Sequence, residues 1–301
     1  MAISRAQLVK ELEPGLNALF GLEYKSYANE HAEIFDTESS DRAFEEEVML
    51  SGFANASVKP EGQGVQFDDA QETFTARYTN ETIALAFAIT EEAIEDNLYD
   101  RLASRYTKAL ARSMANTKQV KAAAVLNNGF NANFAGGDGV ALFATNHPTI
   151  AGTFSNELAV ASDLNETSLE QALIDIAAMT DERGLKIASR GMKLIIPSAL
   201  QFTADRLMKS EGRTGTADND INAVRNMGMI PEGYTVNHFL TSNKKWFIKT
   251  DVPNGLKHFV RSPIKTSMEG DFDTGNVRYK ARERYSFGVS DPRGIFGVEG
   301  A

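Results

Sequence analysis

The longest regular pattern in the chain runs from Thr90 to Asn127, where apolar residues recur at helical spacing without a proline or glycine between them. Thr90 and the two glutamates after it are typical of a helix start, because they satisfy the first free N–H groups and the helix dipole. Gly129 follows the last turn and predicts a left-handed stop. A helix of this length would be about 55 Å long.

The apolar residues of this helix form a row that drifts around its axis. They are Ile94, Leu98, Leu102, Tyr106 and Leu110, with Val120 and Ala124 further along. Because the row keeps no heptad and many charged residues accompany it, the pattern favours a long core helix over a coiled coil or a membrane span.

Strands are predicted by alternation of apolar and polar residues over Phe74–Tyr78 and Ile83–Ile89. Asn80 lies between the two stretches and predicts a turn, so residues 54–89 are expected to form an extended two-stranded ribbon. A ribbon of two strands has too little core to stand alone and must lie on another surface. The same alternation over Val277–Val289 predicts a long strand with a basic outer face.

Shorter elements fill the rest of the chain. Helices are expected at residues 4–12, 15–27, 167–184 and 198–209, a short strand at 193–196, and a hairpin formed by 234–240 and 245–250. Trp246, the only tryptophan, lies on the return strand of this hairpin and is predicted to be a core anchor.

Composition and net charge limit the possible functions. With 301 residues, of which 42% are hydrophobic, the chain can bury a large core. The absence of cysteine excludes disulfides, thiolate metal sites and thiol nucleophiles. A net charge of -10 argues against non-specific binding of DNA or RNA as the main task. No apolar run typical of a secretory signal lies near the first residue, so we expect the protein to stay in the cytosol.

The charges are distributed unevenly. Residues 30–47 carry eight carboxylates against one arginine, whereas residues 257–284 carry seven lysines or arginines against four acids. The acidic segment also contains apolar residues such as Phe35 and Phe44, which need a surface to cover. We therefore expect an N-terminal arm that lies across the chain or across a neighbour, with ion pairs between the acidic and basic segments of different copies.

No familiar catalytic motif is present in the sequence, and the four histidines are scattered. His147 has no metal-ligating partner at short spacing and is interpreted as a structural loop residue. The sequence predicts no catalytic residue, no cofactor and no metal site. Because carboxylates that pair only in space cannot be recognised in one sequence, a cytosolic α+β enzyme with a carboxylate site stays an alternative.

Several short segments, in this order and spacing, resemble one protein family. They are Phe87 to Glu92 with Ile94 to Asp96 at the helix start, Ala141 to Phe143 with His147, Lys193 to Leu200, Trp246 to Ile248, and Arg284 to Val289 followed by Asp291 to Gly294. The chain resembles the tailed-phage major capsid proteins of the Hong Kong 97 (Johnson) fold, most closely their Mu-like major head subunit branch.

The resemblance implies an α+β fold divided into named regions. These are an N-terminal arm (1–53), an extended loop or E-loop (54–89), a peripheral domain (90–191) with a spine helix (90–127), an axial domain (192–255), and strands that return to the peripheral domain (256–301). It also implies an icosahedral shell of hexamers and pentamers that encloses DNA without sequence-specific binding, without catalysis and without contact with a membrane. Assembly would take place in the host bacterial cytoplasm, with separate scaffold, portal and decoration proteins as partners. An encapsulin-like nanocompartment shell is the alternative within the same fold.

Seven charged residues are candidates for contacts between subunits in such a shell. They are Glu45, Glu46, Glu47, Lys59, Arg77, Arg278 and Arg282. Lys59 lies in the ribbon, where some relatives use a lysine for a covalent link between subunits. No motif for its partner is recognisable here, so the resemblance implies non-covalent assembly.

Overall fold

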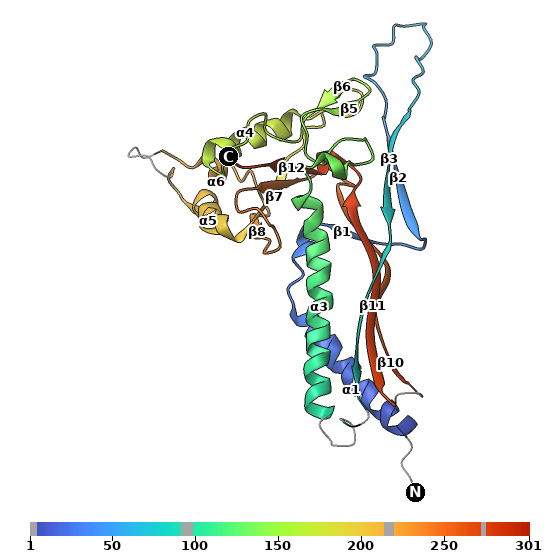
Figure 1. Cartoon of the computed structure of the whole chain (residues 1–301). Helices are drawn as coiled ribbons and strands as arrows, with labels where there is room; N and C mark the ends of the chain where they lie inside the picture. Colours follow the sequence, from blue (N-terminus) through green and yellow to red (C-terminus); the bar gives the residue numbers. More distant parts are fainter. Residues whose placement is uncertain (1–4, 91, 93–98, 214–219, 272–274) are drawn as a thin grey trace.

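The protein has an elongated lower part and a wedge-shaped upper part, as the computed structural model in Figure 1 shows. The structure describes residues 5–90, 92, 99–213, 220–271 and 275–301. The lower part contains the helices α1 and α3 and a long sheet, whereas the upper part contains a second sheet with short helices around it. The predicted α+β class is therefore confirmed.

The predicted spine helix is present as α3, Tyr99–Asn127, which at 1.5 Å per residue is about 43 Å long. The predicted start of the helix at Thr90 borders a stretch outside the described residues. The predicted apolar residues Ile94 and Leu98 also lie outside them. The predicted end at Asn127 is confirmed, but the left-handed stop is wrong, because Gly129 does not have a positive φ. Gly129 is needed for space instead, since a Cβ there would lie 2.5 Å from the ring of Phe143.

The buried face of α3 consists mainly of small residues. These are Ala103, Leu110, Ala111, Met114, Ala115, Ala122, Ala123 and Leu126. Tyr106 and Val120, which the predicted row placed on this face, are about half exposed. The alanines allow α1, Arg5–Ser26, to lie close to α3, where its Leu16 and Phe20 are buried. The two helices predicted for this region are one helix that continues through Pro14.

A four-stranded sheet runs beside these helices. Its order is β1, β10, β11, β4, with the bounds Asp36–Ser39, Leu256–Gly270, Val277–Val289 and Glu81–Ile89. β1 is parallel to β10, and the other pairs are antiparallel. The alternation predicted for β11 is confirmed in its first half, where Val277, Tyr279 and Ala281 are buried while the basic residues between them are exposed, and it is wrong at Ser286, which is buried.

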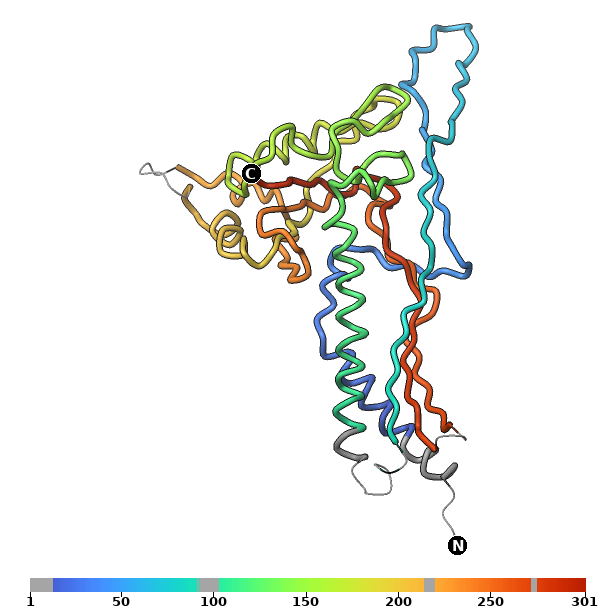
Figure 2. Tube along the Cα trace, in the orientation of Figure 1, coloured from blue at the N-terminus to red at the C-terminus, as the bar shows by residue number. Residues whose placement is uncertain are grey.

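The ribbon predicted from residues 54–89 is wrong in its pairing. β3, Glu72–Thr79, pairs with β2, Phe44–Leu50, whereas β4 belongs to the long sheet. Asn80 makes no hairpin turn, because its buried side chain donates hydrogen bonds to Ser40 Oγ at 2.7 Å and Arg42 O at 3.0 Å. Figure 2 shows the chain passing from the ribbon straight into the long sheet.

The second sheet lies in the wedge-shaped part. Its order is β12, β9, β7, β8, with the bounds Ile295–Val298, Trp246–Thr250, Gly191–Ile196 and Tyr234–Val236. The predicted hairpin is wrong, because β7 lies between the two strands and pairs in parallel with β8 and antiparallel with β9. A local β-strand pattern gives no information about which more distant strand will insert.

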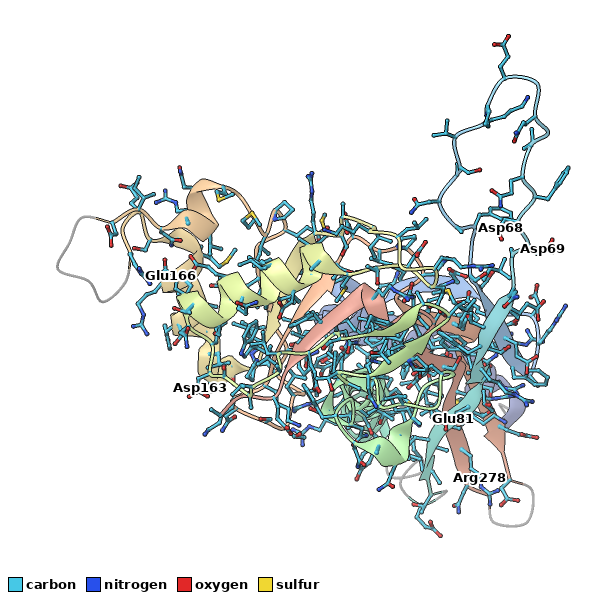
Figure 3. All side chains as sticks on the ribbon, turned by 90° about the horizontal axis from the view of Figure 1, so that it is seen from above. Asp68, Asp69, Glu81, Asp163, Glu166 and Arg278 are labelled. Carbon is cyan, nitrogen blue, oxygen red and sulfur yellow. The ribbon has the colours of Figure 1, made fainter. Side chains whose placement is uncertain are left out.

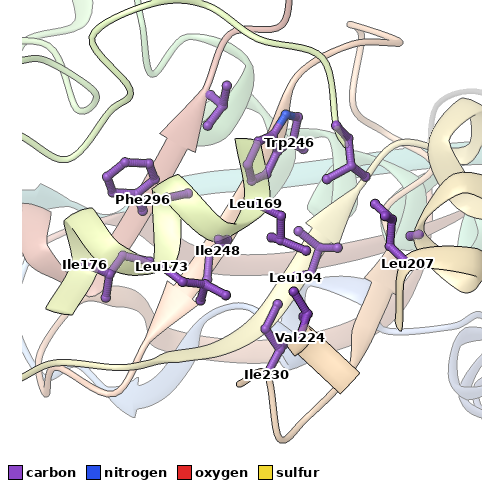
Figure 4. Packing of buried hydrophobic residues seen from close by; sticks show 14 of the residues in the cluster. Leu169, Leu173, Ile176, Leu194, Leu207, Val224, Ile230, Trp246, Ile248 and Phe296 are labelled. Carbon is purple, nitrogen blue, oxygen red and sulfur yellow. The ribbon is translucent and has the colours of Figure 1, made fainter. Parts of the chain in front are cut away.

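The core of this part is formed by the sheet and by α4, Glu166–Ala178 (Figure 4). α5, Gln201–Lys209, and α6, Ala223–Asn226, close its other side. Trp246 is fully buried, as predicted, and its Nε1 donates a hydrogen bond to Ser162 O at 3.2 Å.

The remaining elements are short. They are the 3₁₀ helices η1, η2, η3 and η4 (Glu30–Glu33, Ala132–Phe134, Ser198–Leu200 and Pro292–Gly294) and the strands β5 and β6 (His147–Thr149 and Gly152–Phe154). His147 is buried, with Nδ1 2.6 Å from Asp138 Oδ2 and Nε2 3.1 Å from Asn156 Oδ1. This agrees with a structural role, although His147 begins the strand β5 rather than lying in a loop, and its pairing with Asp138 has no signal in the sequence.

Candidate assembly surfaces

The seven candidate contact residues lie in three places: the β2–β3 ribbon, the loop at its tip, and the outer face of β11. Glu46 and Arg77 are opposite each other on the ribbon, where Arg77 Nε is 3.7 Å from Glu46 Oε1. The Arg77 guanidinium also lies 3.9 Å from the centre of the Phe44 ring. Both charged side chains are about half exposed, so this pair contributes little to stability and is accessible to a neighbouring molecule.

Glu45 is engaged within its own chain. Its Oε1 accepts hydrogen bonds from Ser40 Oγ at 2.8 Å and from the backbone N–H groups of Asp41 and Arg42 at 3.2 and 3.3 Å. The Ser40 hydroxyl and these N–H groups lower the pKa of the carboxyl. Glu45 therefore closes the turn between β1 and β2.

Glu47 is also engaged within the chain, where it pairs with the buried ammonium group of Lys257. The same ammonium group lies 3.0 Å from Glu38 Oε1, and Ser290 donates a hydrogen bond to Glu47. Burial alone would lower the pKa of Lys257, but its hydrogen bonds to Glu47 and Glu38 outweigh burial and raise it. This network connects the root of the ribbon to the long sheet.

The loop of residues 51–71 connects β2 to β3 and extends away from the body, with Asp68 and Asp69 at its base in Figure 3. Lys59 lies on this loop and is exposed. Large apolar side chains are exposed beside it, with Val58 at 93% and Phe67 at 94% of full exposure. Such side chains on an extended loop are typical of a surface that another molecule covers.

Arg278 and Arg282 are exposed on the outer face of β11, on either side of Lys280. Arg278 Nη2 is 2.5 Å from Asp271 Oδ2. In the register of the sheet, Arg282 lies opposite Ala84 of β4 and Lys265 of β10. The structure thus confirms the predicted basic outer face.

Sequence reasoning missed a buried polar cluster that holds the N-terminal arm. In η1 of the arm, the His31 N–H donates to Gln119 Oε1 of α3 at 3.0 Å, and His31 Nδ1 lies 2.9 Å from Gln119 Nε2. The rings of His31 and His258 meet edge to face at 5.2 Å, and Thr37 Oγ1 of β1 lies 3.3 Å from His258 Nδ1. Scattered histidines without a motif carry no sequence signal for such a contact.

Burial, assisted by nearby positive charge, favours the neutral form of both histidines. Burial, with the nearby charge of Lys118, lowers the pKa of His31 to about 4. Burial, with His31 and Lys118, lowers the pKa of His258 to about 3. Lys118 pairs with the buried Glu283 at 2.6 Å, and burial raises the pKa of this carboxyl although Lys118 opposes the shift.

Two cavities are lined by ionisable side chains of the kind that a catalytic site needs. A cavity of about 760 Å³ lies between β3, the end of α3 and the loop after it. Its two carboxylates are already paired, Glu81 with Lys121 and Asp138 with His147. Among the described lining residues of this cavity, no carboxylate or histidine is therefore left unpaired.

A second cavity of about 310 Å³ is lined by acidic residues around Arg293. Arg293 Nη2 lies 2.8 Å from Glu182 Oε1, and its Nη1 lies 3.3 Å from Asp291 Oδ1. Burial raises the pKa of Asp291 although Arg293 opposes the shift. Within the described ranges, no cluster of three or more histidine or acidic side chains could hold a metal ion, and no helix is long and apolar enough to cross a membrane.

Solved structures with the same architecture are capsids and related particles. The chain is similar to the procapsid protein of bacteriophage JBD30, with a TM-score of 0.55, 15% identity, and coverage of 98% of this chain and 76% of that chain. It is also similar to the capsid of an empty GTA particle, with a TM-score of 0.55, 13% identity and 91% coverage of both chains. A virus-like particle from Pyrococcus furiosus matches with a TM-score of 0.52, 12% identity, and coverage of 94% and 98%.

At these identities the likeness establishes the fold, which is the Hong Kong 97 fold that the resemblance implied. No curated protein sequence matches the chain. A family model described as phage capsid protein matches residues 72–298. Because this match covers most of the sequence, the chain belongs to the phage capsid protein family.

Proposed function

We propose that this chain is the major capsid (head) subunit of a tailed bacteriophage and assembles in the host bacterial cytoplasm into hexamers and pentamers of an icosahedral shell around the genome. The family match over residues 72–298 carries this proposal. The exposed apolar loop of residues 51–71 supports it, because an elongated subunit with such a loop is suited to covering a neighbour. The Mu-like branch stays a prediction.

The proposed regions are the arm (1–53), the extended loop (54–89), the peripheral domain (90–191 and 256–301) and the axial domain (192–255). Separation of the long sheet from the second sheet supports two domains, but β12 pairs with β9 and α4 packs on the second sheet, which favours assigning both elements to the axial domain. The pairing of β4 with β11 favours ending the extended loop at Thr79 and assigning β4 to the peripheral domain.

Among the seven candidate contact residues, the exposed ones are best suited to bind a neighbouring molecule: Glu46, Lys59, Arg77, Arg278 and Arg282. Glu45 and Glu47 are better explained by their contacts within the chain. We further propose a non-enzymatic role, no sequence-specific DNA binding, and separate scaffold, portal and decoration proteins.

An encapsulin-like shell is the second candidate, and the likeness to the virus-like particle from Pyrococcus furiosus favours it. Both candidates are shells, and they differ in what the shell encloses. Particles purified from infected cells that contain DNA would support the phage head. Particles that contain a protein cargo would support the alternative.

Size-exclusion chromatography and negative-stain imaging of the expressed chain test the proposal. We expect capsomers or closed particles, and a stable monomer under all assembly conditions would contradict a shell function. Denaturing gels of particles should show a single subunit band, since covalent ladders would refute non-covalent assembly at Lys59.

Charge reversal tests the basic outer face. Arg278→Glu should leave the melting temperature of the subunit nearly unchanged and reduce the yield of particles. Lys186→Glu, which alters an exposed lysine in the Thr180–Lys186 turn, is the matched control and should leave assembly intact. Unfolding of the Arg278 variant would show that its surface assignment is wrong.

A further inference from the structure

The two edges of the long sheet are protected very differently. On the β10 edge, β1 covers Lys257 to Val260, and beyond it the register is irregular and includes Pro263, with charged residues at Lys265 and Glu269. Irregular pairing, proline and charges are the devices by which proteins prevent a further strand from adding to a sheet edge. This edge is therefore closed.

The opposite edge, β4, has none of these devices over most of its length. Its register with β11 is continuous from Glu81 to Ile89. From Thr82 to Ile89 it contains no charge, proline or glycine, and Thr82, Ala84, Leu85, Ala86 and Ala88 are exposed. Among the described residues, the one side chain of β4 that forms an ion pair is that of its first residue, Glu81, which contacts Lys121 of α3. A long, regular and uncharged edge of this kind is a template for another strand.

The side chains beside this edge indicate the chemistry of that strand. Ala84, Ala86 and Ala88 are opposite Arg282, Lys280 and Arg278, and all six residues share the outer face of the sheet. Neighbouring strands lie about 4.8 Å apart, so a strand added to β4 would be roughly 10 Å from β11. Because the alanines between them are short, acidic side chains on every second residue of the added strand could reach the basic row.

The cations of this row are available for such a contact. In the part of the chain that the structure describes, no side-chain ion pair or hydrogen bond is formed by Lys280, Arg282 or Lys265. Two strands of the chain itself, β1 and β2, carry acidic residues at alternate positions, and these residues are already engaged: Asp36 with Lys249, Glu38 and Glu47 with Lys257, and Glu45 with Ser40. These two strands of a second copy are therefore not available to the basic row.

We propose that the β4 edge and the adjacent basic row bind an extended acidic segment of a second protein, which adds to the long sheet as a strand beside β4. Backbone hydrogen bonds to β4 supply the pairing, and carboxylates at alternate positions select the partner through the basic row. In this proposal the side chain of Arg282 binds a carboxylate of a different protein. The proposal does not depend on whether the chain forms a phage head.

The test uses the full-length unassembled chain and a fluorescent peptide of five Thr-Glu repeats. Fluorescence anisotropy measures binding, and hydrogen exchange followed by mass spectrometry locates it. We expect slower exchange over Glu81–Ile89, and about tenfold weaker binding by the Lys280→Glu/Arg282→Glu double variant, since each exposed pair contributes up to about a factor of five. Lys186→Glu is the matched control and should bind as the unmodified chain does.

A peptide of the same sequence with every backbone nitrogen methylated separates strand addition from simple charge attraction. It keeps all carboxylates but has no N–H group left to form a ladder along either edge, so we expect its binding to be lost. The proposal would be overturned if the methylated peptide bound equally well, or if hydrogen exchange over Glu81–Ile89 stayed unchanged on binding. It would also be overturned if a DNA oligonucleotide displaced the peptide fully and left the exchange of β4 unchanged. The methylated peptide is tested on the unmodified chain, so the result does not depend on folding of the double variant.

Discussion

Acidification is expected to release the N-terminal arm from the body of the subunit. The arm is held at η1 and β1 by two histidines that must stay neutral, His31 against Gln119 and His258 against Thr37. The elements packed around them contribute Lys118 from α3, Glu283 and Tyr285 from β11, and Tyr24 from α1. Protonation of both rings would place three positive charges beside the single carboxylate of Glu283.

The sign of the pH dependence follows from the lowered pKa values. An ordinary histidine has a pKa of 6.5, whereas the pKa of His31 is about 4 and that of His258 is about 3 in the folded chain. Between pH 6.5 and these values the unfolded chain binds more protons, so stability falls as the pH falls. The raised pKa of Glu283 acts in the opposite direction, because the folded state takes up that proton more readily.

The size of the effect can be estimated conservatively. One pKa unit corresponds to about 1.4 kcal/mol. Taking half of the shifts of His31 and His258, to allow for solvent screening and relaxation, acidification from pH 6.5 to 3.5 would remove roughly 4 kcal/mol. This is a large part of the 5–15 kcal/mol that stabilises a typical protein. Because local contacts can open separately, we expect the arm to detach before the body unfolds.

The assay combines urea unfolding at several pH values with hydrogen exchange of residues 29–39 in the unassembled subunit. His258→Phe keeps a flat ring to stack on Phe287 but cannot be protonated, so it should reduce the acid-linked loss by about 2 kcal/mol. His238→Gln, which removes an exposed histidine paired with Glu30 of the same arm, is the control and should retain the full loss. Parallel pH profiles of the unmodified chain and His258→Phe would refute the reasoning.

Two further substitutions test the packing and the buried charges. Gly288→Ala should lower the unfolding free energy by about 1–3 kcal/mol in calorimetry, because the new Cβ would lie 2.6 Å from the Tyr78 ring, whereas Gly270→Ala, with nothing within 4 Å, should have little effect. Arg293→Met should cost about 3–5 kcal/mol in urea unfolding by leaving Glu182 buried and unpaired, and adding Glu182→Gln should recover part of that loss. A stable Gly288→Ala variant, or an Arg293→Met variant that the second substitution does not improve, would contradict these expectations.

The elements that sequence reasoning predicted correctly are those with a strong local signal. The end of α3, the alternation along the first half of β11, the buried strand β7 and the burial of Trp246 all follow from periodicity and hydrophobicity, although the cap predicted at Gly129 is wrong. The fold as a whole was identified through resemblance, and the family match supports it.

The errors concern which strands pair. Asn80 predicts a turn because asparagine is frequent in turns, but its side chain binds the arm and the chain continues straight. The same limitation hid the cluster of His31, Gln119 and His258, whose members lie 88 to 227 residues apart and meet only after the sheets have formed. Contacts of this kind have no local pattern, because they depend on tertiary packing.

The buried polar contacts that hold the arm and the ribbon lie where these segments leave the long sheet. Their position limits where the subunit can change shape. Asn80, Lys257 and His31 hold the arm and the base of the ribbon to the long sheet and to α3 through buried polar contacts. The loop beyond them is held at its base by Arg183, whose Nη2 donates to Asp69 O at 2.6 Å, and carries its exposed apolar residues further out. Breaking a buried polar contact is costly, whereas moving an exposed loop is not. If neighbours meet at different angles in hexamers and pentamers, the loop should therefore absorb the difference while the two sheets and α3 keep one structure.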